Sequence, residues 1–166
     1  YHVIEGADQL KVNAGGEEYI AQVVGTDESS DLAVLKIDAS GLTAIEIGSS
    51  SDLTVGEWVM AVGSPFGLEQ SVSTGIVSAT SRTTSALNDS SSGSSAVYTN
   101  MIQTDAAINP GNSGGALVDK DGKLIGVNTL IASSSGSSSG VGFAIPVDYA
   151  MNIAQQIIDG KTPSHA

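Results

Sequence analysis

The sequence predicts an all-β fold closed by one C-terminal helix, and three observations support this prediction. The 166 residues include 20 glycines, and valine, serine and threonine are abundant, a composition typical of short strands joined by small-residue turns. Short apolar or alternating segments recur along most of the chain. Only the last part, from Asp148 onward, repeats its apolar residues with helical spacing. The length suits one domain with a substantial core.

Seven segments have the pattern of strands. The fifth segment contains Gly75, which predicts a bulge or a bend. Asp121-Gly122, between the last two segments, is a strong hairpin signal. The predicted strands lie near residues 10–12, 19–24, 32–37, 58–63, 72–80, 116–118 and 124–127.

The C-terminal helix is predicted by apolar residues spaced three and four apart. Gly160 is expected to cap its end, and Pro163 prevents its continuation. Two serine-rich and glycine-rich segments, residues 83–99 and 133–140, have little to bury and are expected to form mobile surface loops rather than domain linkers. The spaced apolar residues are Ala150, Ile153, Ala154, Ile157 and Ile158.

The charge balance excludes several classes of partner. A net charge of −12 repels nucleic-acid phosphates and anionic lipid headgroups, so we expect neither nucleic-acid binding nor membrane contact.

The chain has no cysteine, and therefore no disulfide and no thiolate metal site. No apolar run approaches the ~20 residues of a membrane span, and no signal peptide is recognisable. Because the chain starts at Tyr1 and enters an apolar strand directly, we expect it to be a piece of a longer protein.

Ser113 is the candidate nucleophile, within Gly111-Asn112-Ser113-Gly114-Gly115. A serine nucleophile needs backbone N–H groups directed at the oxyanion of its intermediate, and glycines allow the sharp turn and the close approach of a substrate carbonyl. The alternative interpretation is a surface turn between two strands.

Asp31 and His2 could complete a catalytic triad with the serine. Asp31 lies directly before the apolar segment 32–37, where it could orient a histidine N–H, and His2 is the only histidine outside the C-terminal tail. Taken alone, Asp31 is better explained as a turn residue at the start of a strand, and His2 as an ordinary exposed side chain. Together, the order His2, Asp31, Ser113 is the order of a chymotrypsin-type triad.

These segments, with others, resemble the HtrA/Deg family of serine proteases. The most specific stretch is residues 103–115, which contains Ser113, and the matching motifs occur in family order along nearly the whole chain. The other matching segments are residues 1–7, 30–35, 63–68, 73–78 and 142–146.

The resemblance implies a chymotrypsin-like double β-barrel with the active site between the barrels. Residues 1–65 would be the remainder of the first barrel, residues 66–146 the second barrel and residues 147–160 the helix. Ser113 would attack the scissile carbonyl, His2 would take its proton and pass it to the leaving amine, and Asp31 would orient the imidazole. The N–H groups of Gly111 and Ser113 would form the oxyanion hole. No metal or organic cofactor is implied.

The resemblance also implies specificity and regulation. Ile108, Leu130 and Ile131 would line the substrate pocket, so we expect cleavage after small or medium aliphatic residues; the alternative is that these side chains belong to the core. Residues 83–100 would act as a sensor loop that controls whether the oxyanion hole forms.

The family further implies properties of a longer parent protein. The opening strands of the first barrel and any PDZ domain lie outside this sequence, so the first barrel would be incomplete and the activity of this chain alone uncertain. The parent would work on unfolded or damaged polypeptides in the cell envelope or outside the cell, and it would form a homotrimer.

Two other functions remain as alternatives. A protease fold could bind polypeptides without cutting them, although such a module has no need for all of His2, Asp31 and Ser113. Asp119 and Asp121 suggest a calcium-binding loop, but the third acidic position and the closing glutamate of an EF-hand loop are missing.

Overall fold

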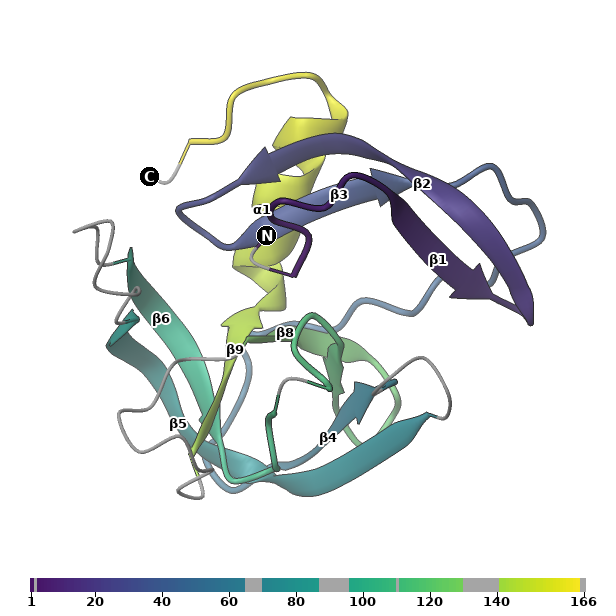
Figure 1. Ribbon diagram of the computed structural model, residues 1–166. Coiled ribbons are helices and arrows are strands. Elements are labelled where there is room, and N and C mark those ends of the chain that lie inside the picture. The colour runs from purple at the N-terminus through teal and green to yellow at the C-terminus, as the bar shows by residue number, and fades with distance from the viewer. Residues whose placement is uncertain (2, 65–69, 87–95, 110, 130–140, 165–166) are drawn as a thin grey trace. The chain divides into compact units, whose positions relative to one another are not determined.

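A computed structural model describes residues 1, 3–64, 70–86, 96–109, 111–129 and 141–164 (Figure 1). The chain divides into two units. One unit comprises Tyr1–Ala44 together with Ala150–Ala166, and the other comprises Ile45–Tyr149. Each unit has its own sheet.

The unit of residues 45–149 is a closed barrel of antiparallel strands. The order around the barrel is β4-β5-β6-β9-β8-β7, and β4 closes it by pairing with β7. Around the closed part of the barrel each strand therefore has a neighbour on both sides. The strands are β4 (Trp58–Gly63), β5 (Ser71–Ala86), β6 (Ala96–Thr104), β7 (Ala116–Val118), β8 (Leu124–Thr129) and β9 (Gly142–Pro146).

Alternation along the strands fills the barrel with small and branched side chains. In β4, Val59 and Ala61 are fully buried whereas Trp58, one position earlier, is 44% exposed. Complete burial of a branched apolar side chain contributes roughly 1.5–3 kcal/mol. The core cluster comprises Val59, Ala61, Val77, Ile102, Ala106, Ile108, Leu117, Ile125 and Ala144.

The other unit combines a three-stranded antiparallel sheet with most of the helix. β1 (Leu10–Ala14) and β3 (Leu32–Lys36) lie on either side of β2 (Glu17–Asp27). The helix packs against Gly25 of β2, where a Cβ atom would lie 2.6 Å from Ile157 Cγ2. This glycine therefore allows close contact between the helix and the sheet.

The helix α1 (Val147–Ile158) ends as the sequence predicts. Gly160 has a φ of +74°, and its N–H donates to the Ile157 carbonyl at 3.0 Å. The Lys161 N–H donates to the Gln156 carbonyl at 2.9 Å. These two bonds form a Schellman motif, which confirms Gly160 as the helix cap.

The hairpin predicted at Asp121-Gly122 is also confirmed. β7 and β8 are antiparallel neighbours, and Gly122 has a φ of +76°. Asp119 Oδ1 accepts the N–H groups of Asp121 at 2.9 Å and Lys123 at 3.0 Å. The Asp119 carboxylate is thereby explained by turn chemistry.

Part of the segment expected to be a loop forms strands instead. β5 continues to Ala86 and β6 starts at Ala96, so the two ends of residues 83–99 pair with each other. Ladder hydrogen bonds to a neighbouring strand compensate for the low apolar content. Residues 87–95 lie outside the described part of the chain, as do residues 133–140.

Two further details differ from expectation. Gly75 pairs directly with Val59, and the register of β5 shifts only after Val77. We also expected the second barrel to begin near residue 66, whereas β4 pairs with β5 and β7 and so belongs to the closed barrel. Among the described residues, none of the helical structure has the length and apolar character needed to cross a membrane.

Candidate active site

Ser113 lies in a tight turn, residues 109–113, that precedes β7. The N–H groups of Asn112 and Ser113 both donate to the Asn109 carbonyl, at 3.1 and 3.2 Å, and close one helical turn. Asn109 Oδ1 accepts the Gly111 N–H at 3.0 Å, in the manner of an N-cap. Gly111 and Ser113, the two expected oxyanion donors, are thus brought together in one turn. Both of their N–H groups donate within that turn.

The buried side chain of Asn112 anchors the start of the turn. Asn112 is only 6% exposed. Its Oδ1 accepts the Asn109 N–H at 2.9 Å, and its Nδ2 donates to the Ala107 carbonyl at 2.8 Å. A buried amide bonded at both ends holds its neighbours in a defined geometry.

Two glycines allow the turn to pack directly against β4. At Gly63, a Cβ atom would lie 2.4 Å from Asn112 Cβ. At Gly115, it would lie 2.0 Å from the Val62 carbonyl oxygen. Both distances are far below van der Waals contact, so only glycine fits at these positions without displacement of the turn.

β8 supports the turn on its C-terminal side. The Gly114 N–H donates to the Asn128 carbonyl at 2.7 Å, and the Asn128 N–H donates to the Gly115 carbonyl at 2.9 Å. The Asn128 side chain donates to the Ala116 carbonyl at 3.2 Å. Hydrogen bonds therefore hold the turn on both sides of Ser113, through Asn112 before it and through Gly114 and Gly115 after it.

Ile108 is the one expected pocket residue that lies within the described part of the chain. It is 7% exposed and belongs to the barrel core cluster. A Cβ atom at Gly142 would lie 2.4 Å from Ile108 Cγ1, so β9 approaches this side chain closely. Leu130 and Ile131 lie outside the described residues, and the pocket stays a prediction.

Asp31 lies in the other unit, at the start of β3. It is 8% exposed and has a φ of +58°, a left-handed conformation that aspartate tolerates better than most residues. The preceding turn is fixed by Asp27, whose Oδ2 accepts the Ser30 N–H at 3.2 Å and the Ser30 hydroxyl. A residue held in a rare conformation by a buried turn is typical of functional sites.

Tyr1, the chain neighbour of His2, lies beside Asp31. Its backbone nitrogen lies 2.6 Å from the Asp31 carbonyl oxygen and 3.1 Å from Asp31 Oδ1. The Glu5 carboxylate raises the pKa of the Tyr1 phenol above its ordinary value of 10.0, so the phenol is neutral near pH 7. His2 itself lies outside the described residues, and the triad stays a prediction.

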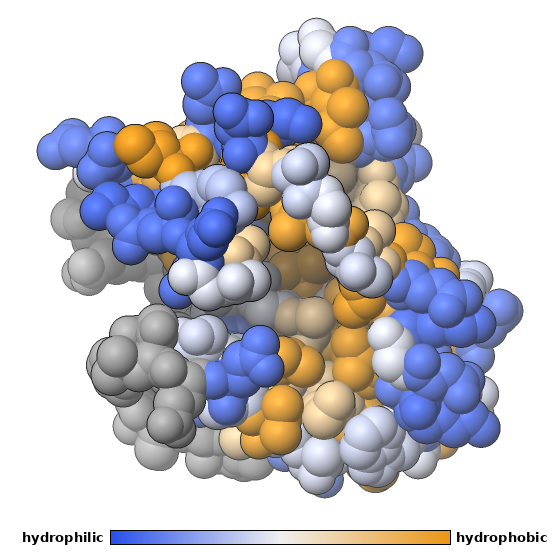
Figure 2. All heavy atoms as spheres, turned by 90° about the vertical axis from the view of Figure 1, so that its right-hand side faces the viewer, coloured by the Kyte–Doolittle hydropathy of each residue, from blue (hydrophilic) through white to orange (hydrophobic). Residues whose placement is uncertain are grey.

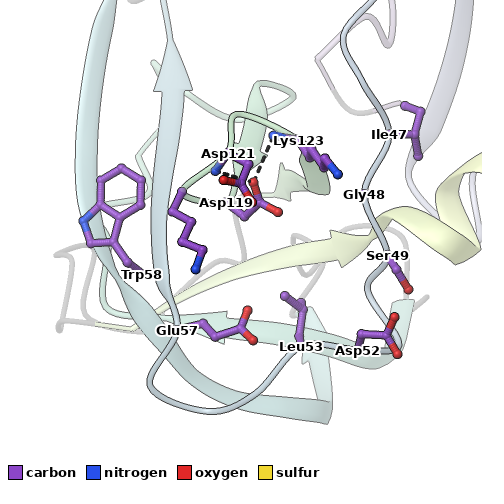
Figure 3. A pocket seen from close by; sticks show the side chains of 11 residues that line it. Ile47, Gly48, Ser49, Asp52, Leu53, Glu57, Trp58, Asp119, Asp121 and Lys123 are labelled. Carbon is purple, nitrogen blue, oxygen red and sulfur yellow. Dashed lines mark hydrogen bonds between the residues drawn. The ribbon is translucent and has the colours of Figure 1, made fainter.

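A separate pocket of about 670 Å³ lies in the barrel unit (Figure 3). Trp58, Ile47 and Leu53 give it apolar walls, while aspartates, Glu57 and two lysines give it charges of both signs. The dashed lines in Figure 3 show one carboxylate of this pocket bonded to backbone N–H groups of the hairpin. Within the described ranges, no three His, Asp or Glu side chains gather so that they could hold a metal ion.

Apolar side chains also reach the surface. Figure 2 shows orange patches between hydrophilic side chains on one face of the molecule. Ile20 on β2 is 64% exposed and Val72 on β5 is 60% exposed. Scattered exposure of this kind is normal for a protein surface and does not identify a site.

Sequence reasoning missed several residues that shape the site. The amides of Asn109, Asn112 and Asn128 hold the turn, and Gly63 makes room for it. One signal was available for Asn109, because asparagine followed by proline favours the first turn of a helix. The contact of Gly63 joins residues about fifty positions apart and leaves no local pattern.

Comparisons with known proteins give one consistent result. The probable periplasmic serine endoprotease DegP-like of Halomonas elongata is 50% identical over 157 residues, which are 94% of this chain and 31% of that protein. Protease Do-like 1, chloroplastic, of Arabidopsis thaliana is 49% identical over 161 residues, which are 95% of this chain and 36% of that protein.

A solved structure of the HtrA-type protease AlgW with a tripeptide matches with a TM-score of 0.83 and 51% identity. The match covers 97% of this chain and 52% of AlgW. The chain thus spans about a third of the length of the curated relatives and about half of this structure.

The similarity to HtrA/Deg proteases expected from the motifs is confirmed by these matches. The mostly β fold with one C-terminal helix agrees with the same relatives. The family model for the trypsin-like peptidase domain matches residues 1–127. Because this match covers more than half of its residues, the chain belongs to the family of trypsin-like peptidase domains.

Proposed function

We propose that the chain is the protease module of a serine endopeptidase that cleaves unfolded or damaged polypeptides. Ser113 attacks the scissile carbonyl, His2 acts as general base and then as general acid, and Asp31 orients the imidazole and stabilises its charged form. The N–H groups of Gly111 and Ser113 supply the oxyanion hole.

The observation that carries this proposal is the anchored turn around Ser113. A partly exposed serine follows the buried Asn112 and precedes Gly114, whose N–H is bonded to β8. Such rigidity is what a nucleophile requires, because acyl transfer depends on reacting groups held in the correct geometry. A surface turn with no function has no need of three asparagine side chains that each bond the backbone.

Two observations support the other triad members. Asp31 is buried and held in a left-handed backbone conformation, which is typical of functional positions. The backbone nitrogen of Tyr1 lies 3.1 Å from Asp31 Oδ1, so the residue next to His2 lies close to the proposed triad aspartate. Relatives about 50% identical are named as probable serine endoproteases, which supports the same chemistry.

The specificity and the setting belong to this proposal as well. Ile108, Leu130 and Ile131 form an apolar pocket that accepts small or medium aliphatic residues. Residues 83–100 act as the sensor loop, although residues 87–95 of it lie outside the described part. The parent works in the cell envelope, as the periplasmic names of several relatives suggest, and it forms a homotrimer.

Casein hydrolysis tests the function. The longer protein that contains this chain, its Ser113→Ala variant and the 166-residue chain alone are compared. We expect cleavage by the longer protein and none by the Ser113→Ala variant. If the variant cuts equally well, Ser113 is not the nucleophile. If nothing cuts but casein still binds, the chain is a polypeptide-binding module.

A further inference from the structure

We propose that Asn128 is a positioning residue whose side-chain amide holds a β-bulge that orients the Ser113 hydroxyl. The inference rests on the proposed function, because that function makes Ser113 the nucleophile. It assigns a task to a buried residue outside the triad, outside the expected pocket and outside the turn that precedes the serine.

A bulge follows Ser113 directly. Gly114 and Gly115 both lie opposite Asn128, because the Gly114 N–H donates to the Asn128 carbonyl at 2.7 Å and the Asn128 N–H donates to the Gly115 carbonyl at 2.9 Å. Gly114 has a φ of +86°, as the first residue of a G1 bulge requires. Regular pairing of β7 with β8 begins at Ala116. Because a bulge redirects the side chains beside it, this one determines the direction of Ser113.

The side chain of Asn128 adds a third bond to the same stretch. Its Nδ2 donates to the Ala116 carbonyl at 3.2 Å, so Asn128 bonds three consecutive residues after Ser113. The register of glycine-rich strands is weakly specified, and residues 114 and 115 are both glycine. The bond from the side chain to Ala116 therefore fixes the place of the bulge, which the two backbone bonds alone specify weakly.

Asparagine is a costly residue at this position, which indicates that its amide has a task. Asn128 is 1% exposed, and within the described part of the chain its Oδ1 accepts no hydrogen bond. A buried acceptor without a partner destabilises a fold. Asn128 pairs with Ala144, a member of the barrel core cluster, so its side chain lies on the apolar face of the sheet. A branched apolar side chain would avoid this cost, and what asparagine adds is the bond to Ala116.

Removal of the amide should slow the chemical step. We expect Asn128→Leu, which has nearly the same shape, to lower kcat and the rate of fluorophosphonate labelling of Ser113 about tenfold, a factor within the free energy of one buried hydrogen bond. KM should stay unchanged, because the substitution acts on the nucleophile and not on substrate binding. Ile125→Val is the matched control, since it shortens another buried side chain of β8 and should keep the labelling rate.

Asn128→Asp gives a readout that a purely structural role would not change. Its carboxyl group has the shape of the amide, and the protonated form can donate its O–H to the Ala116 carbonyl. Burial raises the pKa of a carboxyl group, and β7, β8 and β9 carry no titratable side chain that would oppose this effect. The labelling rate of this variant, divided by that of the unaltered protein at the same pH, should therefore rise toward one as the pH falls from about 8 to about 6.

All samples are prepared in the longer protein that contains this chain, and each labelling rate is corrected for the folded fraction. An unchanged rate in Asn128→Leu would overturn the proposal, and so would a rate ratio for Asn128→Asp that does not depend on pH.

Failure of the proposed function is distinguishable from failure of this inference. If the unaltered protein neither cleaves peptide nor reacts with a fluorophosphonate, the proposed function fails, and hydrogen exchange of the Gly114 N–H then tests the bulge separately. Faster exchange in Asn128→Leu than in Ile125→Val would support the restraint by Asn128, and equal exchange would overturn it.

Discussion

A methyl group added at Gly63 should misplace the nucleophile turn. The added Cβ atom would lie 2.4 Å from Asn112 Cβ, 2.7 Å from Asn112 Cα and 2.8 Å from the Gly111 carbonyl oxygen. Carbon atoms that are not bonded need about 3.5–4.0 Å, so β4 and the turn must separate by about 1 Å. Gly63 does not have a positive φ, so the effect of Gly63→Ala comes from this contact rather than from backbone strain.

This displacement sets the expected decrease in the rate of reaction at Ser113. A misplacement of ~1 Å at a reacting group costs about 100-fold in rate. We therefore expect Gly63→Ala to react about 100-fold more slowly with a fluorophosphonate that labels Ser113. The labelling rate is corrected for the folded fraction, which thermal unfolding gives independently.

Gly48→Ala is the matched control. A Cβ atom at Gly48 would lie 3.2 Å from Lys123 Cβ and from Ile125 Cγ2, which is a mild contact away from the turn. This variant should lose a little stability and keep its labelling rate. Equal labelling of Gly63→Ala and the unaltered chain would refute the conclusion that Gly63 positions the turn.

Three other substitutions test separate parts of the fold and the site. Asp27→Ala removes the acceptor that fixes the turn before Asp31, and urea unfolding should show a loss of about 1–3 kcal/mol, with a smaller loss in Asp27→Asn. Gly142→Ala should push on Ile108 and shift the cleavage preference in a peptide library toward smaller residues; an unchanged preference would remove Ile108 from the pocket. Gly160→Ala places a side chain at a φ of +74° and should lower the unfolding free energy by about 1 kcal/mol while Ser113 labelling stays the same, and a slower labelling rate would contradict a purely local role.

Local patterns predicted the elements that depend on near neighbours. The helix with its cap at Gly160 and the hairpin at Asp121-Gly122 follow from spacing and turn chemistry alone. The serine motif likewise marked the turn that holds Gly111 and Ser113. Each of these features is encoded within a few residues of sequence, which is why reading along the chain recovers it.

Features that depend on distant contacts were not recoverable in the same way. β6 was not predicted because its first residues directly follow a serine-rich run, although β6 itself contains Val97, Tyr98 and Ile102, which favour strands. Gly75 suggested a bulge, yet its reason is the approach of Asp105, whose Oδ1 would lie 2.3 Å from a Cβ there. Gly63 gave no signal for a comparable reason, since its partner Asn112 is far away in sequence.

The central claim is that Ser113 is an activated nucleophile. Mass spectrometry after reaction with a fluorophosphonate tests it most directly, on the longer protein that contains this chain and on its Ser113→Ala variant, with its Asp31→Asn variant as a third sample. We expect one adduct, located on Ser113, absent from Ser113→Ala and formed more slowly in Asp31→Asn. An adduct on another serine, or equal labelling of Ser113→Ala, would contradict it.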